Sequence, residues 1–585
     1  MNGRLRSRLV PLTVLLTAAT ACSGGGGSSH PTTTGAAAAP VEGGTVTIPL
    51  TLPFTSYNPN TPDTNTTANT EVVNAIQPWV VKFDDHADLV VDPSLVTVTK
   101  TSDDPLVVDY AFNPAAVWSD GQPVGCDDVY LAWVADNGVV KDPATNTPIF
   151  QTVSTTGWDQ IVGITCSGDG KTATVTYGSA FSDWKSLVAE LLPAHVVAGH
   201  AGLASAAGIR TAYEGKDAAA LHKIADFWNT GFLTEKGLDP AVLLSAGPYR
   251  ISRIDGEDGV TLVRNEKYWG PRPPLDTIQF RTVTSEGVQA QALANHELDV
   301  ARITAPDADA VSRLTSLDGV TVNRSAGYSF EHLDFNFDLP LFQDKAVRQA
   351  VADCVPRQEI LDKLVKPVNG DAVLLQNRMF FPGQAGYADT SGGRYDRVDI
   401  AAAKATLEAD GWTLDGNVYT KNGQRLQFGL LHKNVATRSA IAQLVQASCA
   451  AAGIAVVDDG DPTWTDRVGR GQFDLVGFSW DGSPLLSSQP SIYETRVGVD
   501  NPGLNYSGYS NPDVDALMHV LATETDEAKR ADAANRADAL LWADVATIPL
   551  YQLPAVMAWT EHLHGVKPNP TLQGLTWNVE TWTVS

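Results

Sequence analysis

Few residues in this chain are spaced for covalent catalysis. Ser182 and Lys185 fit the Ser-x-x-Lys spacing of one class of serine hydrolase, but the companion motifs of that class are missing. We therefore interpret residues 182–190 as a helix that carries both side chains on its surface. The chain has neither Gly-x-Ser-x-Gly nor His-Glu-x-x-His, and His562 and His564 lack a nearby third zinc ligand. The pattern predicts a protein that is not an enzyme and has no catalytic residue, metal site or cofactor.

An aromatic and an acidic residue side by side, Trp480 and Asp481, are better suited to non-covalent recognition. They follow an apolar run, residues 473–478, that predicts a strand. A carboxylate in a partly desolvated cleft binds an ammonium group strongly because the two charges are opposite. The alternative interpretation is a turn aspartate before Gly482, and the sequence leaves both open.

The N-terminus has the pattern of an export signal. Three arginines among the first eight residues precede an apolar run, residues 9–21, that is too short to span a bilayer. Small residues lead into Cys22, which resembles the lipid-attachment cysteine of bacterial lipoproteins, although Ala19 stands where that motif usually has leucine. Residues 23–44 are rich in Gly, Ser, Thr, Ala and Pro, so they predict a flexible linker. The alternative is a plain signal peptide that is cleaved near residue 21.

Four cysteines remain in the chain after Cys22. An even number in an exported protein predicts disulfides. Three pairings are possible, and we expect Cys126–Cys166 and Cys354–Cys449. The first pair lies within one short stretch, and the second joins two predicted apolar helix faces. Four unpaired buried thiols are the alternative.

Composition sets the broad class of the protein. The 585 residues are 43% hydrophobic, which is enough for more than one domain, and the net charge of −26 argues against nucleic acid as a partner. The hydrophobic pattern predicts strands at residues 44–50, 106–112, 172–177, 247–264 (a hairpin), 275–283, 298–300, 328–337, 473–478 and 548–550. It predicts helices at residues 127–134, 182–190, 285–294, 344–353, 400–409, 437–451, 513–523 and 526–543. This order predicts a mixed α/β protein with two lobes.

Four motifs occur together in a characteristic order. They are AVWSDGQPV at residues 116–124 followed by DDV, GPY at 247–249 followed by LVRNEKYWG at 262–270, LDFN at 333–336 followed by FQDKAVRQA at 342–350, and NYSGYSNPDVD at 505–515 followed by IPLY at 548–551. In this order they resemble the extracytoplasmic solute-binding proteins of family 5, the oligopeptide- and dipeptide-binding lipoproteins of peptide ABC importers, of the type found in actinobacteria. The resemblance covers residues 44–582.

The resemblance implies a two-lobe, periplasmic-binding-protein-like clamp of class II (cluster C type), with an extra subdomain on the first lobe. We expect a signal peptide at residues 1–21, the lipidated cysteine and linker at 22–43, and lobe 1 at 44–95, 186–305 and 548–585. The extra subdomain is expected at 96–185 and lobe 2 at 306–547. In such a clamp the ligand is trapped by hinge closure. The two disulfides would then hold the extra subdomain and lobe 2.

The resemblance also implies ligand, partners and location. We expect a monomer, lipid-anchored on the extracytoplasmic face of the cell membrane, that delivers peptides to ABC permease subunits driven by cytoplasmic ATPases. Relatives carry haem, metal chelates or oligosaccharides, or present signalling peptides, and these alternatives stay open. A secreted, lipid-anchored hydrolase is a further alternative.

The family's amine-binding aspartate follows a tryptophan after a strand, which points to Trp480 and Asp481, although the family usually has two residues between them. Its cleft strand corresponds to residues 328–337. Alternation puts Leu333 and Phe335 on one face of that strand, so the polar face offers three candidates. The candidate contacts are Tyr328, His332 and Asn336, with Tyr57 and Asn58 from a cleft loop. A solvated strand face is the alternative.

Overall fold

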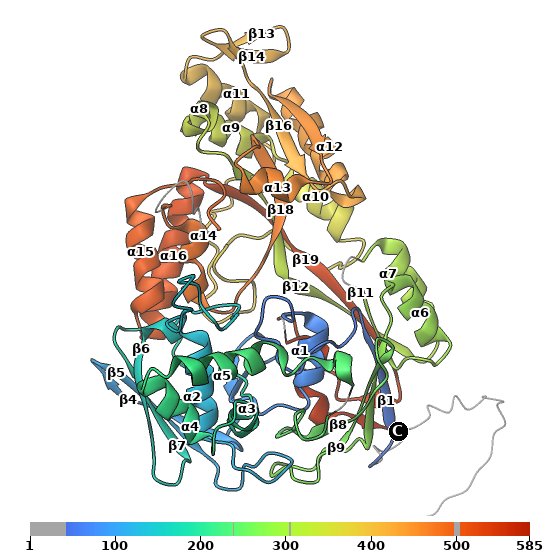
Figure 1. Ribbon diagram of the computed structural model, residues 1–585. Coiled ribbons are helices and arrows are strands. Elements are labelled where there is room, and N and C mark those ends of the chain that lie inside the picture. Colours follow the sequence, from blue (N-terminus) through green and yellow to red (C-terminus); the bar gives the residue numbers. More distant parts are fainter. Residues whose placement is uncertain (1–41, 238, 304–305, 497–503, 572) are drawn as a thin grey trace, which may run out of the picture. The chain divides into compact units, whose positions relative to one another are not determined.

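The computed structural model describes residues 42–237, 239–303, 306–496, 504–571 and 573–585 (Figure 1). The predicted signal peptide, Cys22 and the linker up to residue 41 lie outside the described residues. Within the described ranges, no helix combines the length and the apolar character needed to cross a bilayer.

A four-stranded sheet organises the N-terminal part of the described chain. Its order is β1 (Thr45–Leu50), β10 (Thr277–Thr282), β9 (Gly259–Arg264) and β8 (Tyr249–Ile254). β1 runs parallel to β10, and the other pairs are antiparallel. The strand β1 forms because its alternating apolar residues are fully buried, so one face of the sheet covers the first hydrophobic core.

A second four-stranded sheet falls inside the range expected for the extra subdomain. Its order is β4 (Val96–Asp103), β5 (Leu106–Phe112), β7 (Thr172–Tyr177) and β6 (Ile161–Cys166). Helix α2 (Cys126–Asp136) contacts β6 and β7. The Cys126–Cys166 disulfide joins the start of α2 to the end of β6.

The largest sheet has six strands, and two of them are unusually long. Its order is β11 (Val300–Ile303), β19 (Thr547–Thr560), β12 (Val320–Phe335), β18 (Leu475–Asp481), β16 (Gln427–His432) and β17 (Ala455–Gly460). β12 and β19 pair antiparallel over most of their lengths, with register shifts between Ala326 and His332. β19 contributes Met557 to the first core and Ile548 and Leu550 to a second core, so this strand connects the two, while β12 adds Leu333 and Phe335 to the second core (Figure 1).

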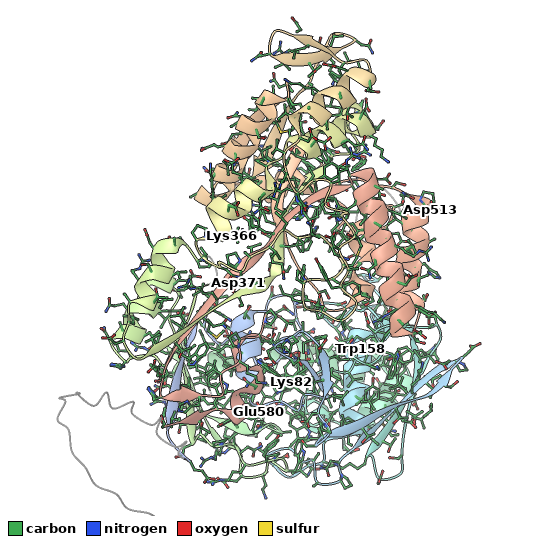
Figure 2. The ribbon with its side chains drawn as sticks, turned by 180° about the vertical axis from the view of Figure 1, so that it is seen from behind. Lys82, Trp158, Lys366, Asp371, Asp513 and Glu580 are labelled. Carbon is green, nitrogen blue, oxygen red and sulfur yellow. A yellow bond between two sulfur atoms is a disulfide. The ribbon has the colours of Figure 1, made fainter. Side chains whose placement is uncertain are left out.

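The remaining elements cover these sheets. The helices are α1 (Thr67–Val73), α3 (Ala194–His200), α4 (Ala207–Glu214), α5 (Ala218–Thr230), α6 (Glu286–Ala294), α7 (Ala308–Thr315), α8 (Pro340–Gln343), α9 (Lys345–Cys354), α10 (Arg357–Ile360), α11 (Ile400–Ala409), α12 (Ala436–Ala451), α13 (Trp464–Gly469), α14 (Pro490–Tyr493), α15 (Pro512–Thr523) and α16 (Glu527–Asp544). The short strands are β2 (Val81–Phe83), β3 (Leu89–Val91), β13 (Thr413–Asp415), β14 (Val418–Lys421), β15 (Gln424–Arg425), β20 (Leu563–His564) and β21 (Thr583–Val584). Figure 2 shows the same ribbon from behind, with the side chains that these elements carry.

The second disulfide lies in the second core. Cys354 ends α9 and Cys449 lies on α12, and both side chains are fully buried. The two disulfides are the pairs expected from the sequence. The second closes a loop across 95 positions, so it limits the conformations of the unfolded chain strongly.

The prediction of a helix at residues 182–190 is wrong. The segment forms turns, so Ser182 and Lys185 do not lie on a helix surface. The Ser182 amide donates to the carbonyl of Ala522 at 3.0 Å, and Asp183 forms an ion pair with Arg530. Contacts to distant residues replace the local hydrogen bonds that a helix would need.

A buried carboxyl on α2 predicts a specific pH dependence of stability. Burial raises the pKa of Asp136 from its ordinary value to about 7, although Thr152 Oγ1 donates to it at 2.6 Å. Between pH 4 and 7 the folded protein keeps a proton that the unfolded chain releases, so this group destabilises the fold progressively as pH rises through that window. We expect Asp136→Asn to raise the melting temperature at pH 8 and not at pH 4, as calorimetry at both pH values would measure. An equal effect at both pH values would contradict this assignment.

Candidate ligand-binding site

The candidate residues of the cleft strand lie where β12 pairs with β18. Phe330 lies opposite Trp480, His332 lies opposite Phe478, and Ser329 lies opposite Asp481. Side chains alternate along a strand, so Trp480 and Asp481 leave β18 on opposite faces. The two residues are neighbours in sequence, but the strand separates their side chains.

An aromatic stack forms on the Trp480 face. The Trp480 ring lies nearly parallel to Tyr506, with centroids 5.7 Å apart, and to His332, with centroids 6.0 Å apart. Trp480 and Tyr506 are half-buried, whereas His332 is only 1% exposed. Among the described residues, neither ring nitrogen of His332 has a hydrogen-bond partner, although Asp334 Oδ1 lies 3.3 Å from Nε2. The rings of Trp480 and Tyr506 are therefore partly exposed to a ligand, and the buried ring nitrogens of His332 next to them are unsatisfied.

Two carboxylates lie on the opposite face, in contrasting surroundings. Asp481 is exposed and accepts a hydrogen bond from Ser329 Oγ at 2.7 Å. Glu331 is buried and accepts from Arg438 Nε and Nη2 at 2.9 and 3.1 Å, and from Ser479 Oγ at 2.7 Å. Because Arg438 already neutralises Glu331, Asp481 is the carboxylate of this pair that is open to a cationic group from solvent.

Tyr328 links β12 to a neighbouring loop. Its hydroxyl accepts a hydrogen bond from Gln384 Nε2 at 2.5 Å, and its ring packs edge-to-face on Phe381 with centroids 4.8 Å apart. Ala87, from the turn between β2 and β3, belongs to the same apolar cluster. Burial raises the pKa of Tyr328 above its ordinary range, so the hydroxyl stays protonated and can donate.

A cavity of about 760 Å³ lies beside Gln384 and will be called the central cavity. Its lining comes from residues 83–91, Val98 and residues 182–186 of the N-terminal part, and from residues within 380–386, 484–486 and 525–531. Asp88, Asp183, Lys185, Glu527 and Arg530 give it a mixed charge. The volume of the central cavity is typical of a site for a small ligand.

Three predicted contacts are held by the protein itself. Asn336 Nδ2 donates to the carbonyls of Gly471 and Phe473 at 3.1 and 2.8 Å. Tyr57 is fully buried, and Asn58 Nδ2 donates to the carbonyl of Trp228 at 2.9 Å. None of these three lines the central cavity, and neither do the other predicted contacts, Tyr328, His332, Trp480 and Asp481. Their assignment as ligand contacts stays a prediction.

Sequence reasoning missed several residues around the central cavity. Gln384, Asp183 and Arg530 lie in segments far apart in the chain, and no motif connects them. Tyr506 was inside a recognised motif, but its stacking partner was not apparent. In the described ranges, no cluster of three or more His, Cys, Asp or Glu side chains is arranged to hold a metal ion.

Residues 90–497 match the model of the bacterial extracellular solute-binding proteins, family 5 (middle region). The chain belongs to this family. The family prediction and the two-lobe clamp are thereby confirmed, since solved structures share the fold over almost the whole chain. Family 5 members are binding proteins that work with ABC transporters.

Several curated relatives of this family 5 protein are mycobacterial. The oligopeptide-binding protein OppA of Mycobacterium tuberculosis is 29% identical over 473 residues, which is 79% of this chain and 71% of OppA. An uncharacterized lipoprotein of the same organism is 28% identical over 511 residues, 85% of each chain.

Solved structures that resemble this chain are named for different ligands. The periplasmic EDTA-binding protein EppA is 25% identical and aligns over 95% of this chain and 99% of its own, with a TM-score of 0.80. The oligopeptide-binding protein AppA of Bacillus subtilis, in complex with a nonapeptide, is 19% identical, aligns over 93% and 100%, and has a TM-score of 0.66. The latter comparison speaks for the fold alone.

Proposed function

We propose that this protein captures peptides between its two lobes and delivers them to the permease of an ABC importer. The observation that carries the proposal is family membership together with a central cavity whose lining comes from both the N-terminal segments and residues 380–531. OppA, named for binding oligopeptides, supports peptides as the ligand class. The lobe boundaries given above are part of the proposal.

Each side of the site has a role in this proposal. Asp481 binds the α-amino group of the peptide, while Trp480 and Tyr506 accept apolar side chains on the other face. Tyr328 borders the cavity through Gln384. His332, Asn336, Tyr57 and Asn58 support the site from inside the protein, because their side chains are buried and do not line the central cavity.

The proposal includes a lipid anchor at Cys22 on the extracytoplasmic side of the membrane. The lipoprotein relative supports it. Mass spectrometry of the protein purified from membranes tests it, since acylation adds a defined mass to a chain that begins at Cys22. A mature chain without added lipid mass would overturn the anchor and leave the ligand proposal intact.

A second candidate ligand class is a metal chelate. EppA, an EDTA-binding protein, is 25% identical with a TM-score of 0.80. One experiment distinguishes peptides from metal chelates as the ligand. The purified protein is mixed with peptides of two to six residues, or with Fe(III)-EDTA, and its melting temperature and native mass are measured, because a ligand that binds only the folded state must raise that temperature. A shift with peptides alone supports the proposal, and a shift with Fe(III)-EDTA alone replaces it.

From the proposed role of Asp481 we predict that a peptide needs a free amino terminus to bind tightly. Among peptides retained by the wild-type protein, we expect acetylation of the amino terminus to weaken binding at least tenfold, because the acetylated nitrogen carries no charge for Asp481. In Asp481→Ala both forms should bind with equal, weaker affinity. Asp466→Ala, which changes an exposed aspartate on α13, serves as the control. Isothermal titration measures the affinity of each protein for the free and the acetylated peptide. A wild-type protein that binds both forms equally would exclude Asp481 as the residue that binds the amino terminus.

A further inference from the structure

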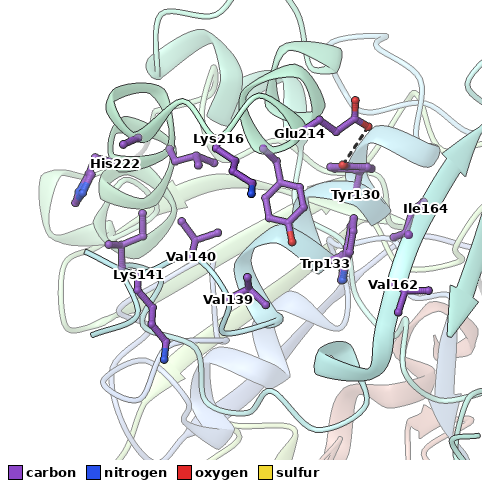
Figure 3. A pocket seen from close by; sticks show the side chains of 15 residues that line it. Tyr130, Trp133, Val139, Val140, Lys141, Val162, Ile164, Glu214, Lys216 and His222 are labelled. Carbon is purple, nitrogen blue, oxygen red and sulfur yellow. Dashed lines mark hydrogen bonds between the residues drawn. The ribbon is translucent and has the colours of Figure 1, made fainter. Parts of the chain in front are cut away.

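A second cavity, of about 610 Å³, lies against helix α2 and will be called the α2 pocket. It shares no lining residue with the central cavity. Its walls come from α2, α4, α5, β6 and the segment after α2, and its floor includes the rings of Tyr130, Trp133 and Tyr213 (Figure 3). The Cys126–Cys166 disulfide ties α2 to β6, so two of the walls are held together covalently.

The lining of the α2 pocket is apolar inside and at its mouth. Trp133 and Ile164 are buried, whereas Val139 and Val162 are 64% and 66% exposed. Large apolar side chains this exposed are unfavourable in water unless something covers them. Trp133 Nε1 is buried and has no hydrogen-bond partner among the described residues. The pocket therefore offers mainly apolar surface to a ligand.

The charge at the mouth favours an anion. Lys141 and Lys216 line the pocket, and neither forms an ion pair with any described residue, in a protein whose net charge is −26. One carboxylate, Glu214, also lines the pocket and accepts from the Tyr130 hydroxyl at 3.5 Å, while Asp142 lies outside the lining, 3.7 Å from His222. Figure 3 shows the amine of Lys216 turned toward the middle of the lining side chains.

Lys216 holds this place at a conformational cost. Its φ of 53° lies in the left-handed region, which residues with a Cβ rarely adopt, and it directly follows Gly215 at the end of α4. A glycine or asparagine would fit this turn better. Backbone strain of this kind, at a residue whose amine points into a pocket, often accompanies binding sites.

We propose that the α2 pocket binds an amphiphile with an acyl chain and an anionic head, of the chemical class of long-chain fatty acids. The chain lies against the apolar walls and covers Val139 and Val162 at the mouth. The head group accepts hydrogen bonds from the Lys216 amine. The same chemistry is offered by a free fatty acid and by the acyl chain of an anionic membrane lipid, and the experiment separates these two sources.

The test measures binding of hexadecanoate to the purified full-length mature protein by isothermal titration below the critical micelle concentration. We expect one saturable site, at least fivefold weaker binding of the methyl ester, and at least tenfold weaker binding by Val162→Asp and Lys216→Glu. Both substitutions change exposed side chains and leave the core intact. Lys223→Glu, on α5 outside the pocket, should bind like the wild type.

Vesicles of phosphatidylcholine with and without phosphatidylglycerol separate the two sources. Binding of free hexadecanoate by the α2 pocket identifies the free acid, and binding only to vesicles that contain phosphatidylglycerol, lost in Val162→Asp, identifies a membrane lipid. A protein that binds neither probe, or whose binding is the same in Val162→Asp and Lys216→Glu as in the wild type, overturns the proposal. A peptide held in the central cavity should not displace hexadecanoate, and displacement would likewise overturn it.

Discussion

Asp538→Ala is expected to lower the free energy of unfolding by about 3–5 kcal/mol. Asp538 and Arg378 form an ion pair at 2.9 Å with both side chains fully buried. Arg378 also donates to Thr547 Oγ1 and to the Thr547 carbonyl, each at 2.7 Å, and its guanidinium lies 4.3 Å from the centroid of the Trp542 ring. Without Asp538 a buried positive charge loses its counter-ion, and this loss costs more than the pair contributes.

The same helix offers a matched control for this prediction. Asp532 lies 3.5 Å from Arg536 on α16, with both side chains about two-thirds exposed. Exposed pairs contribute little, so Asp532→Ala should change stability by less than about 0.5 kcal/mol. Differential scanning calorimetry of the two variants measures the contrast. Equal losses would show that burial does not set the value of the Asp538–Arg378 pair.

Asp183→Ala is expected to weaken peptide binding by about 10–100-fold, mainly through faster dissociation. Asp183 Oδ1 accepts from Arg530 at 2.5 Å and Oδ2 from the Ser487 amide at 3.0 Å, and its side chain is buried. These contacts join the two groups of segments that line the central cavity. In the proposed function the ligand lies between these two groups of segments. Removing the Asp183 carboxylate therefore favours the state in which the two groups are apart, and the ligand dissociates faster.

A double-mutant cycle separates this contact from a general loss of stability. Asp183→Ala, Arg530→Ala and the double variant should show strong coupling in the dissociation rate of a retained peptide. The neighbouring Lys185–Glu527 pair, 2.6 Å apart and exposed, should show a coupling of about 1 kcal/mol or less. Additive effects at Asp183 and Arg530 would mean that their contact does not hold the ligand in place.

Several elements followed from local sequence patterns. β1, β5 and α12 lie within one or two residues of their predicted positions, because an alternating or helical pattern of buried apolar side chains is a local property of the chain. The disulfides also followed, since the first pair of cysteines lies within one short stretch and the second pair lies on two predicted apolar helix faces.

Other features depend on partners far away in the sequence. The strand predicted to end at residue 478 continues to Asp481 because its last residues pair with β12. The strand predicted at residues 548–550 is part of β19, which extends to Thr560 by pairing with β12 over most of its length. Strand length is set by the partner's hydrogen bonds rather than by local preference.

The sequence alone indicated the family, the absence of known hydrolase motifs, the order of most elements and the two disulfide pairs. Only the tertiary structure decided that Trp480 and Asp481 face opposite ways, that Asp183 meets Arg530, and that two cavities lie apart. The reason is physical. Helices and buried strands follow from periodicities of neighbouring residues, whereas cavities and buried ion pairs form between segments whose approach is decided by packing of the whole chain.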